Sequence, residues 1–285
     1  MGGNAGLDFG GAVAVGGSLA LAGGVQAGTR LDVGGDLDVG GALGRPASAV
    51  AVGGAARIGG GVDVASLHAT GSITIPAGAP RGGDLSPAPI AGAVSVPPPC
   101  RCDAVDVAAI VEAHRTANHD AAIALAPDAL ADVRGDATLE LPCGRFFLTR
   151  VQASGGGRIT LRASGRTALF VAGGVTVDGT LSVEVAEGAE LDLFVAGSLN
   201  LPATALLGDP GRPRALRIYA AAGGAVTLQA GSRLAGNLYA PSVDLAASGS
   251  LEVYGSVLVG RLAGGAALTV HRDRAISAAA ASCPP

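Results

Sequence analysis

A six-residue repeat near the start of the chain constrains the fold more than any other feature. Its short segments alternate apolar and polar residues and then end in Gly-Gly, as in VAVGGS, LALAGG and LDVGGD. Such a segment forms one side of a coil, and three sides give a coil of about 18 residues. We therefore predict an all-β fold, a parallel β-helix (β-solenoid) with triangular coils. The apolar residues that set the period are Val13, Leu19, Val25, Leu31, Leu37 and Leu43.

The composition supports this prediction. Hydrophobic residues make up 49% of the chain but aromatic residues only 3%, so the apolar content is mostly Ala, Val and Leu, which suit a narrow interior. The 47 glycines of the 285 residues recur at regular corners, which argues against low-complexity disorder. The formal net charge is −4, and the basic residues are all arginines without a basic run. We therefore expect no nucleic-acid partner, and the lack of lysine excludes Schiff-base chemistry.

Changes of pattern along the chain predict four segments. The hexads indicate a regular solenoid over residues 1–78, in which residues 1–11 form a Gly-rich lead. A Pro-rich linker follows over 79–102, and a helical insertion over 103–145, with Asp103 as the expected N-cap. From residue 146 to 285 looser alternating segments indicate a second solenoid with a tail and a loop at 208–214.

The second half resembles a bacterial solenoid domain of surface and secreted proteins, some of them associated with pilus assembly. The resemblance is carried by a G-x-[IL]-YAP element at Gly236–Pro241, a YG-S-x-x-G element at Tyr254–Gly260 and a terminal element at His271–Asp273. In the last of these, Arg272 replaces the usual Tyr. The N-terminal hexads are similar to bactofilins, and that resemblance implies end-to-end filaments. Neither resemblance implies a catalytic site.

Four cysteines bear on the compartment: Cys100, Cys102, Cys143 and Cys283. Their even number suggests two disulfides, with Cys100 and Cys102 bonded to Cys143 and Cys283 in either order. A four-cysteine zinc site and free thiols are the alternatives, and the C-x-C spacing is poor for zinc. We expect a secreted or cell-surface protein whose leader is missing from this chain, with no membrane span and no cofactor.

Candidate chemical groups are few, and each has a simpler structural interpretation. The densest set of potential ligands is Glu112, His114, His119 and Asp120, which reads more simply as a solvated polar face. His68 lacks the partner acid that an acyltransferase base needs. A polysaccharide-active enzyme would use outward carboxylates, and the local acidic stretch offers Glu184, Glu187, Glu190 and Asp192. Four aspartates of the hexad block are expected outward and solubilising: Asp32, Asp36, Asp38 and Asp63.

We therefore predict a non-enzymatic, extracellular structural protein that assembles head to tail with copies of itself into filaments or a surface fibre. The first regular coil has no evident cap, and an unpaired coil edge is a template for another copy. The predicted assembly end consists of Val13, Val15, Leu19, Leu21 and Val25. One alternative is a monomeric surface module that binds a protein, such as a pilus-associated partner, or a glycan through the helical insertion or the 208–214 loop. A β-helix polysaccharide-active enzyme is the other.

Overall fold

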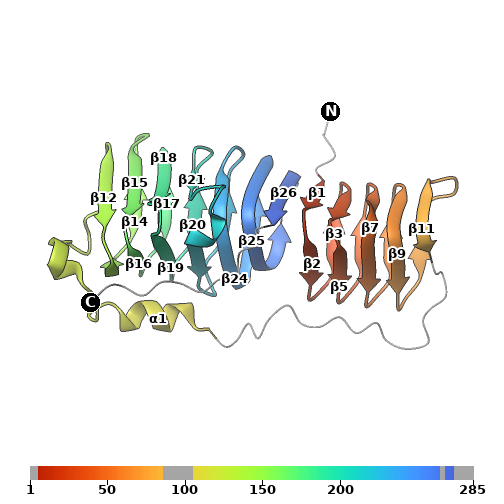
Figure 1. The fold of residues 1–285 in the computed structure, drawn as a ribbon, viewed down its shortest axis with the longest axis horizontal. Coiled ribbons are helices and arrows are strands. Elements are labelled where there is room, and N and C mark those ends of the chain that lie inside the picture. Colours follow the sequence, from red (N-terminus) through yellow and green to blue (C-terminus); the bar gives the residue numbers. More distant parts are fainter. Residues whose placement is uncertain (1–5, 86–104, 264–266, 273–285) are drawn as a thin grey trace. The chain divides into compact units, whose positions relative to one another are not determined.

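The computed structural model describes residues 6–85, 105–263 and 267–272, and it is a parallel β-solenoid, as the hexads predict (Figure 1). The chain divides into two compact units. Unit 1 comprises residues 1–101 and 265–272, and unit 2 comprises residues 102–264 and 273–285. Each unit is described separately below.

Unit 1 has three parallel faces. The first face stacks β1 (Leu7–Phe9), β4 (Val25–Ala27) and the first parts of β7 (Leu43–Val52), β9 (Val62–Ala69) and β11 (Arg81–Leu85). The second stacks β2 (Ala12–Val15), β5 (Arg30–Val33) and the later parts of β7, β9 and β11. The third stacks β3 (Leu19–Leu21), β6 (Leu37–Val39), β8 (Ala56–Ile58) and β10 (Ile73–Thr74). A last strand, β26 (Ala267–Arg272), pairs with β1.

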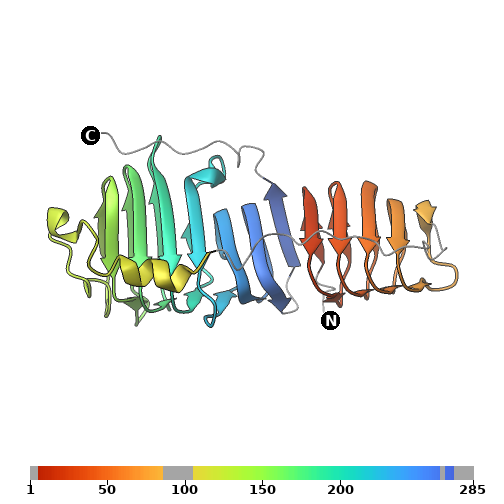
Figure 2. The same ribbon diagram turned by 90° about the horizontal axis from the view of Figure 1, so that it is seen from below.

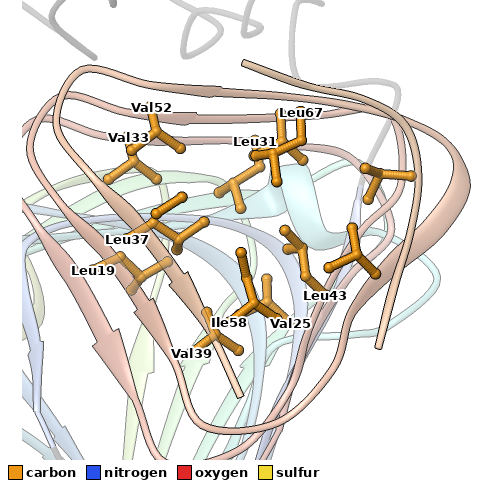
Figure 3. Close-up of a cluster of buried hydrophobic side chains, with 14 of the residues drawn as sticks. Leu19, Val25, Leu31, Val33, Leu37, Val39, Leu43, Val52, Ile58 and Leu67 are labelled. Atoms are coloured by element: carbon orange, nitrogen blue, oxygen red, sulfur yellow. The ribbon is translucent and has the colours of Figure 1, made fainter. Parts of the chain in front are cut away.

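The register confirms the predicted coil length. Val13 pairs with Leu31, Leu19 with Leu37, and Val25 with Leu43, each pair 18 residues apart. Because alternate strand residues point to the same face, each hexad places its first apolar residue inside the coil. Figure 3 shows these side chains meeting within the triangular section, and Val25, Leu31 and Leu37 are 0% exposed.

Glycines are needed at the corners because successive coils approach closely there. A Cβ added at Gly40 would lie 2.5 Å from the carbonyl oxygen of Ala22 in the previous coil, which is far too close. Gly40 does not have a positive φ, so it is close approach rather than an unusual backbone conformation that requires glycine here. At Gly17 a Cβ would meet nothing within 4 Å.

Unit 2 is also three-faced. Its first face consists of β12 (Ala137–Leu141), β15 (Arg158–Ala163), β18 (Thr180–Val185), β21 (Leu206–Leu207) and the first parts of β24 (Arg233–Ala247) and β25 (Ser250–Ala263). Its second consists of β13 (Gly144–Leu148), β16 (Arg166–Val171), β19 (Glu190–Val195), β22 (Leu216–Ala220) and the middles of β24 and β25. Its third consists of β14 (Val151–Ala153), β17 (Val175–Val177), β20 (Leu199–Leu201), β23 (Val226–Leu228) and the ends of β24 and β25.

Coil length varies in unit 2, as the looser pattern predicts. Paired residues are 22 positions apart between β12 and β15 (Ala137 with Ile159) and 25 apart between β19 and β22 (Leu193 with Ile218). The separation falls to 19 between β24 and β25 (Ala235 with Tyr254). The longest coil includes the 208–214 loop, which contains the start of a 3₁₀ helix, η3 (Pro213–Ala215).

The only α-helix of the described residues, α1 (Val107–Ala113), runs along the stacking direction of unit 2 (Figures 1 and 2). A 3₁₀ helix, η2 (Asp120–Ile123), follows it. The N-cap of α1 is Asp106, whose Oδ1 accepts a hydrogen bond from the Ala109 amide at 3.0 Å. The predicted cap, Asp103, lies outside the described residues.

Several boundaries differ from the predicted ones. Leu7–Phe9 forms a strand inside the predicted Gly-rich lead, and Arg81–Leu85 forms a strand inside the predicted linker. The second solenoid begins with β12 and β13, within the segment expected to be a helical insertion. Each of these strands pairs with a strand of the neighbouring coil, and a short segment of sequence does not by itself show that it will stack on that coil.

Replacing Gly40 with Ala tests the close approach of the coils. We expect Gly40→Ala to lower the free energy of unfolding by about 1–3 kcal/mol, because its methyl group meets backbone rather than a movable side chain. Gly17→Ala is the matched control, and its effect is expected to stay within about 1 kcal/mol. Guanidinium unfolding followed by far-UV circular dichroism measures both. Equal effects of the two substitutions would contradict the explanation.

Candidate functional site

The predicted cluster of Glu112, His114, His119 and Asp120 does not form one site. Glu112 forms an ion pair with Arg115 at 2.9 Å. The ring of His114 stacks on Phe170, with centroids 3.9 Å apart, and its Nδ1 lies 2.8 Å from the carbonyl oxygen of Ile110. His119 and Asp120 lie at the edge of β13. No group of three or more potential metal ligands occurs within 6–85, 105–263 and 267–272.

His119 and Asp120 cover the exposed edge of the first coil of unit 2. The His119 amide donates to the Arg145 carbonyl at 2.7 Å, and the Arg145 amide donates to His119 Nδ1 at 3.2 Å. The Phe147 amide donates to Asp120 Oδ1 at 2.9 Å. These two side chains therefore accept hydrogen bonds from strand amides that a preceding coil would otherwise satisfy.

The chain after Asp120 extends this cover to β14. The Thr149 amide donates to the Pro127 carbonyl at 2.7 Å, and the Gln152 amide donates to the Leu130 carbonyl at 2.8 Å. Val133 then pairs with Ala153 as an isolated parallel bridge. We call residues 118–135 the end cap. It covers two faces of the first coil, whereas β12 pairs only with β15 among the described strands.

Asp120 is the buried polar residue of the end cap. It is 7% exposed, and burial raises the pKa of its carboxyl group above the ordinary value, although the hydrogen bond from the Phe147 amide acts in the opposite direction. The protonated form is therefore favoured more in the folded protein than in the unfolded chain.

A row of aromatic rings follows the second face of unit 2. Phe170 stacks on Phe194, with centroids 5.0 Å apart, and Phe194 stacks on Tyr219 at 4.5 Å. Tyr219 meets Tyr239 at 6.0 Å with tilted planes. Because neighbouring rings cover both faces of Phe194, its faces are not available to a sugar ring. Val107 and Val111 of α1 pack on this row.

The acidic stretch predicted as a possible enzyme site is distributed over two faces. Glu184 on β18 pairs with Arg162 at 2.8 Å. Glu190 and Asp192 on β19 lie between Arg166 and Arg217 of the two neighbouring coils: Arg166 lies 2.6 Å from Asp192, and Arg217 lies 2.6 Å from Glu190. Arg217 also donates to Asp192. Glu187 is exposed in the turn between β18 and β19.

The first coil of unit 1 is not open along β1. Its main-chain partners are β4 on one side and β26 on the other. The prediction that Val25 belongs to an assembly end is therefore wrong: Val25 is 0% exposed in β4, which lies between β1 and β7. The prediction missed the additional strand formed by Leu7–Phe9.

The other residues of the predicted assembly end lie in β2 and β3. Val13, Val15 and Leu21 are half-buried against the core, whereas Leu19 is 9% exposed. Among the described strands of unit 1, β2 pairs only with β5 and β3 only with β6.

The last coil of unit 1 has a comparable edge. Among the described strands, β10 pairs only with β8, and β11 pairs only with β9. Ile73 and Ile75 are half-buried against the core at this end. The neighbouring residues Thr74 and Ala77 are exposed.

A shallow groove of about 920 Å³ crosses the first face of unit 1. Glycine is the commonest residue of its lining, and its charged residues are Asp8, Arg45, Asp63 and Arg81. Arg45 forms an ion pair with Asp8 two coils away. The groove is lined by more apolar than polar surface, and its two aspartates and two arginines form no cluster of like charge.

The aspartates and the histidine of the hexad block lie on outward positions. Asp36 Oδ1 accepts from the Ala55 amide at 2.8 Å, which ties two coils together. Asp32 pairs with Arg30 at 2.6 Å but is 8% exposed, so it is less exposed than predicted. Asp38 lies 3.9 Å from Arg57, and Asp63 is exposed. His68 lies half-buried on β9.

Of the four predicted bridge-forming cysteines, the structure describes Cys143. It is disulfide-bonded rather than a free thiol. Cys100, Cys102 and Cys283 lie outside the described residues, so the pairing stays a prediction. The 208–214 loop is held to the previous coil, because Arg212 donates to the carbonyl groups of Val185 and Ala186 at 2.9 Å each. None of the described helices has the length and hydropathy needed to cross a membrane.

The part of the chain that contains the end cap and the solenoid of unit 2 matches a recognised family. Residues 102–279 match the family described as a domain of unknown function (DUF7305), and the chain belongs to that family. Neither the comparison with curated proteins nor the comparison with solved structures gives a match. The family match supports neither the bactofilin-like resemblance nor the association with pilus assembly.

The sequence contained signals for two features that were missed. An aromatic residue recurs once per coil at Phe147, Phe170, Phe194, Tyr219 and Tyr239, and this recurrence predicts the stacked row. The role of Asp120 had a weaker signal, namely a histidine and an aspartate directly before a solenoid block. The pairing of β26 with β1 had none.

Removing the Asp120 carboxylate tests the end cap. We expect Asp120→Ala to lower the free energy of unfolding by about 1–3 kcal/mol, because it leaves the buried Phe147 amide without an acceptor. Asp120→Asn keeps a carbonyl oxygen and is expected to lose less. Hydrogen exchange at the Phe147 amide should accelerate in the Ala variant and stay slower in the Asn variant. Equal losses in both variants would show that the acceptor is not what matters.

The raised pKa of Asp120 also predicts a pH dependence. Between the pKa of the unfolded chain, about 3.9, and the higher pKa of the folded protein, the folded state binds more protons. The stability contributed by this group is therefore full at low pH and is lost as the pH rises through that window. Relative to Asp120→Asn, the wild-type protein should become less stable from about pH 3 to neutrality. A constant difference, or one of opposite sign, in urea unfolding across this range would contradict it.

Proposed function

We propose that this is a structural, non-enzymatic protein of an extracellular or cell-surface location that associates end to end with copies of itself. The observation that supports it is the edge of the last coil of unit 1. There β10 and β11 pair on one side only among the described strands. Backbone amide and carbonyl groups along a strand edge offer hydrogen bonds to another strand.

The apolar residues at this edge also favour association. Ile73 and Ile75 pack against the core but remain partly exposed, whereas equivalent residues in inner coils are buried. A second copy placed against this edge would bury both side chains, and its own strands would form hydrogen bonds with the backbone of β10 and β11. Burial of apolar surface contributes roughly 25 cal/mol per Å², so such a contact combines both kinds of stabilisation.

The contrast with unit 2 supports this choice of surface. The end cap uses His119 and Asp120 to satisfy the strand amides of its first coil. Terminal repeats of solenoids need such caps to stay soluble. The last coil of unit 1 shows no equivalent side-chain acceptor within the described residues, so we assign the contact to this end.

The paired charges support a non-enzymatic role. Glu190 and Asp192 lie between two arginines, and Glu184 is paired with Arg162. A carboxylate that acts as a general acid or base has to be free to exchange a proton with its substrate. These carboxylates instead connect neighbouring coils. The disulfide of Cys143 supports an oxidising compartment.

When two copies associate through the same surface of each, that surface is used up in both, and the assembly stops at a dimer. The predicted filament, and the bactofilin-like behaviour that it implies, therefore needs a second contact. A monomeric module that binds a protein, such as a pilus-associated partner, or a glycan is the alternative, and α1 and the 208–214 loop are its predicted surfaces. Arg212 holds that loop to the previous coil through hydrogen bonds to two carbonyl groups, and this does not favour the loop as a binding surface.

Lysines at the edge of the last coil test the proposal. We expect the wild-type protein to show an increasing mass with concentration in size-exclusion chromatography with light scattering. Thr74→Lys/Ala77→Lys should stay at the mass of one chain, because like charges would face each other across the contact. Negative-stain images of the wild type should show particles joined at their ends.

The control adds the same two charges away from the edge. Gln26 and Gln152 are exposed on β4 and β14. Gln26→Lys/Gln152→Lys should associate as the wild type does. A wild-type protein that keeps the mass of one chain at all concentrations would refute the proposal, and so would an edge variant that associates normally.

A further inference from the structure

Strand β26 belongs to a different unit from the residues on either side of it. Residues 265–272 are part of unit 1, whereas the chain before residue 265 and after residue 272 is part of unit 2. The first face of unit 1 therefore begins with a strand that comes from the far end of the sequence. The β26 strand also lies inside the matched family region, 102–279, whereas its partner β1 lies outside it.

The contact between β26 and β1 is an ordinary parallel pairing. Leu7 pairs with Leu268, Asp8 with Thr269, and Phe9 with Val270. The Gly10 amide donates to the Val270 carbonyl at 2.8 Å, and the Leu268 amide donates to the Gly6 carbonyl at 3.1 Å. Leu268 is 2% exposed and Val270 is 9% exposed, so both contribute to the interior of the coil.

Within the part of the chain that the structure describes, no contact requires this pair to form within one molecule. The two strands are separated by about 260 residues of sequence, and a second copy presents the same strand with the same side chains. A contact of this kind forms equally well between copies, and the balance depends on the effective concentration of the two strands within one chain. In contrast, the end cap of unit 2 comes shortly before β13 and β14, the strands that it covers, in the sequence.

We propose that β26 is an exchangeable strand, and that its second partner is β1 of another copy of this chain. The strand that completes the first coil of unit 1 is then donated by a neighbouring molecule. This exchange uses the end of unit 1 opposite to the edge formed by β10 and β11. The exchange supplies the second contact that an open-ended assembly requires. Only this consequence rests on the proposed function.

Cysteine pairs in the full-length chain test the exchange. Asp8 and Thr269 are both half-exposed and directly paired, and neighbouring parallel strands bring Cα atoms within the roughly 4.4–6.8 Å that a disulfide needs. One preparation carries Asp8→Cys and another carries Thr269→Cys. The two are mixed, held at high concentration, diluted and oxidised. A disulfide between positions 8 and 269 can then form only between molecules.

The expected result is a covalent dimer on a non-reducing gel, with a linked peptide of positions 8 and 269 in the mass spectrum. Mixing Gln26→Cys with Thr269→Cys is the control, because β4 lies beyond β1 and should give no such link. The wild-type chain controls for its own cysteines. In the double variant Asp8→Cys/Thr269→Cys, a link within one chain verifies the register.

The outcomes separate this proposal from the proposed function. A double variant that links fully within one chain, together with mixed single variants that give no dimer, would overturn the exchange and leave the contact at β10 and β11 unaffected. The same cross-link experiment repeated with Thr74→Lys/Ala77→Lys added should still give the dimer. Loss of the dimer in that background would show that the two contacts are not separate, and would refute exchange as an independent contact.

Discussion

Parallel pairing of each coil with the next is the interaction on which the rest of the structure depends. It fixes which residues lie above one another: Val13, Leu31 and Val50 form one inward column, because each strand residue pairs with its equivalent in the next coil. The same pairing requires close approach at the corners, where a Cβ at Gly40 would meet the backbone of the previous coil. The faces are therefore constrained, and differences in coil length are confined to corners and loops. Unit 2 illustrates this, since the separation of paired residues changes from 22 to 25 and then to 19 while its faces stay in register.

Pairing that is complete inside a solenoid leaves unpaired backbone groups at its ends, and the chain deals with this in two ways. In unit 2, His119 and Asp120 accept hydrogen bonds from the β13 amides, and the carbonyl groups of the end cap do the same for later strands. Asp120 is buried in the process, at the cost of a raised pKa. In unit 1, the strand β26 covers β1 instead. A side-chain cap ends the stacking, whereas a strand continues it. The first coil of unit 2 and the first coil of unit 1 thus differ in whether a further strand pairs with their edge.

The sequence predicts what repeats and fails where one strand has no repeat to support it. The period of six and the Gly-Gly corners predict the coil length and the inward residues, because both follow from the geometry of a strand. Leu7–Phe9 was missed, since three residues in a Gly-rich lead carry no periodicity of their own. The partner of β26 is not encoded in any local pattern, because the choice of which coil edge it joins depends on the whole folded unit. The grouping of Glu112, His114, His119 and Asp120 failed for a related reason: neighbours in sequence point to different partners once a helix, a turn and a strand edge meet.

The lateral faces of unit 2 use most of their chemical groups for contacts between coils. The aromatic rings stack along the solenoid axis from His114 to Tyr219, so each inner ring presents its edge rather than its face to the surroundings. A sugar-binding platform needs an uncovered ring face, and the catalytic use of carboxylates needs groups that are not already bridged by arginines. Phe194 and Asp192 satisfy neither condition. At the coil edges, by contrast, strands such as β10 and β11 pair on one side only among the described strands, and the apolar side chains of Ile73 and Ile75 stay half-buried. A backbone edge recognises another strand whatever its sequence, and this is the reason for proposing a second solenoid of the same coil geometry as the partner of these edges.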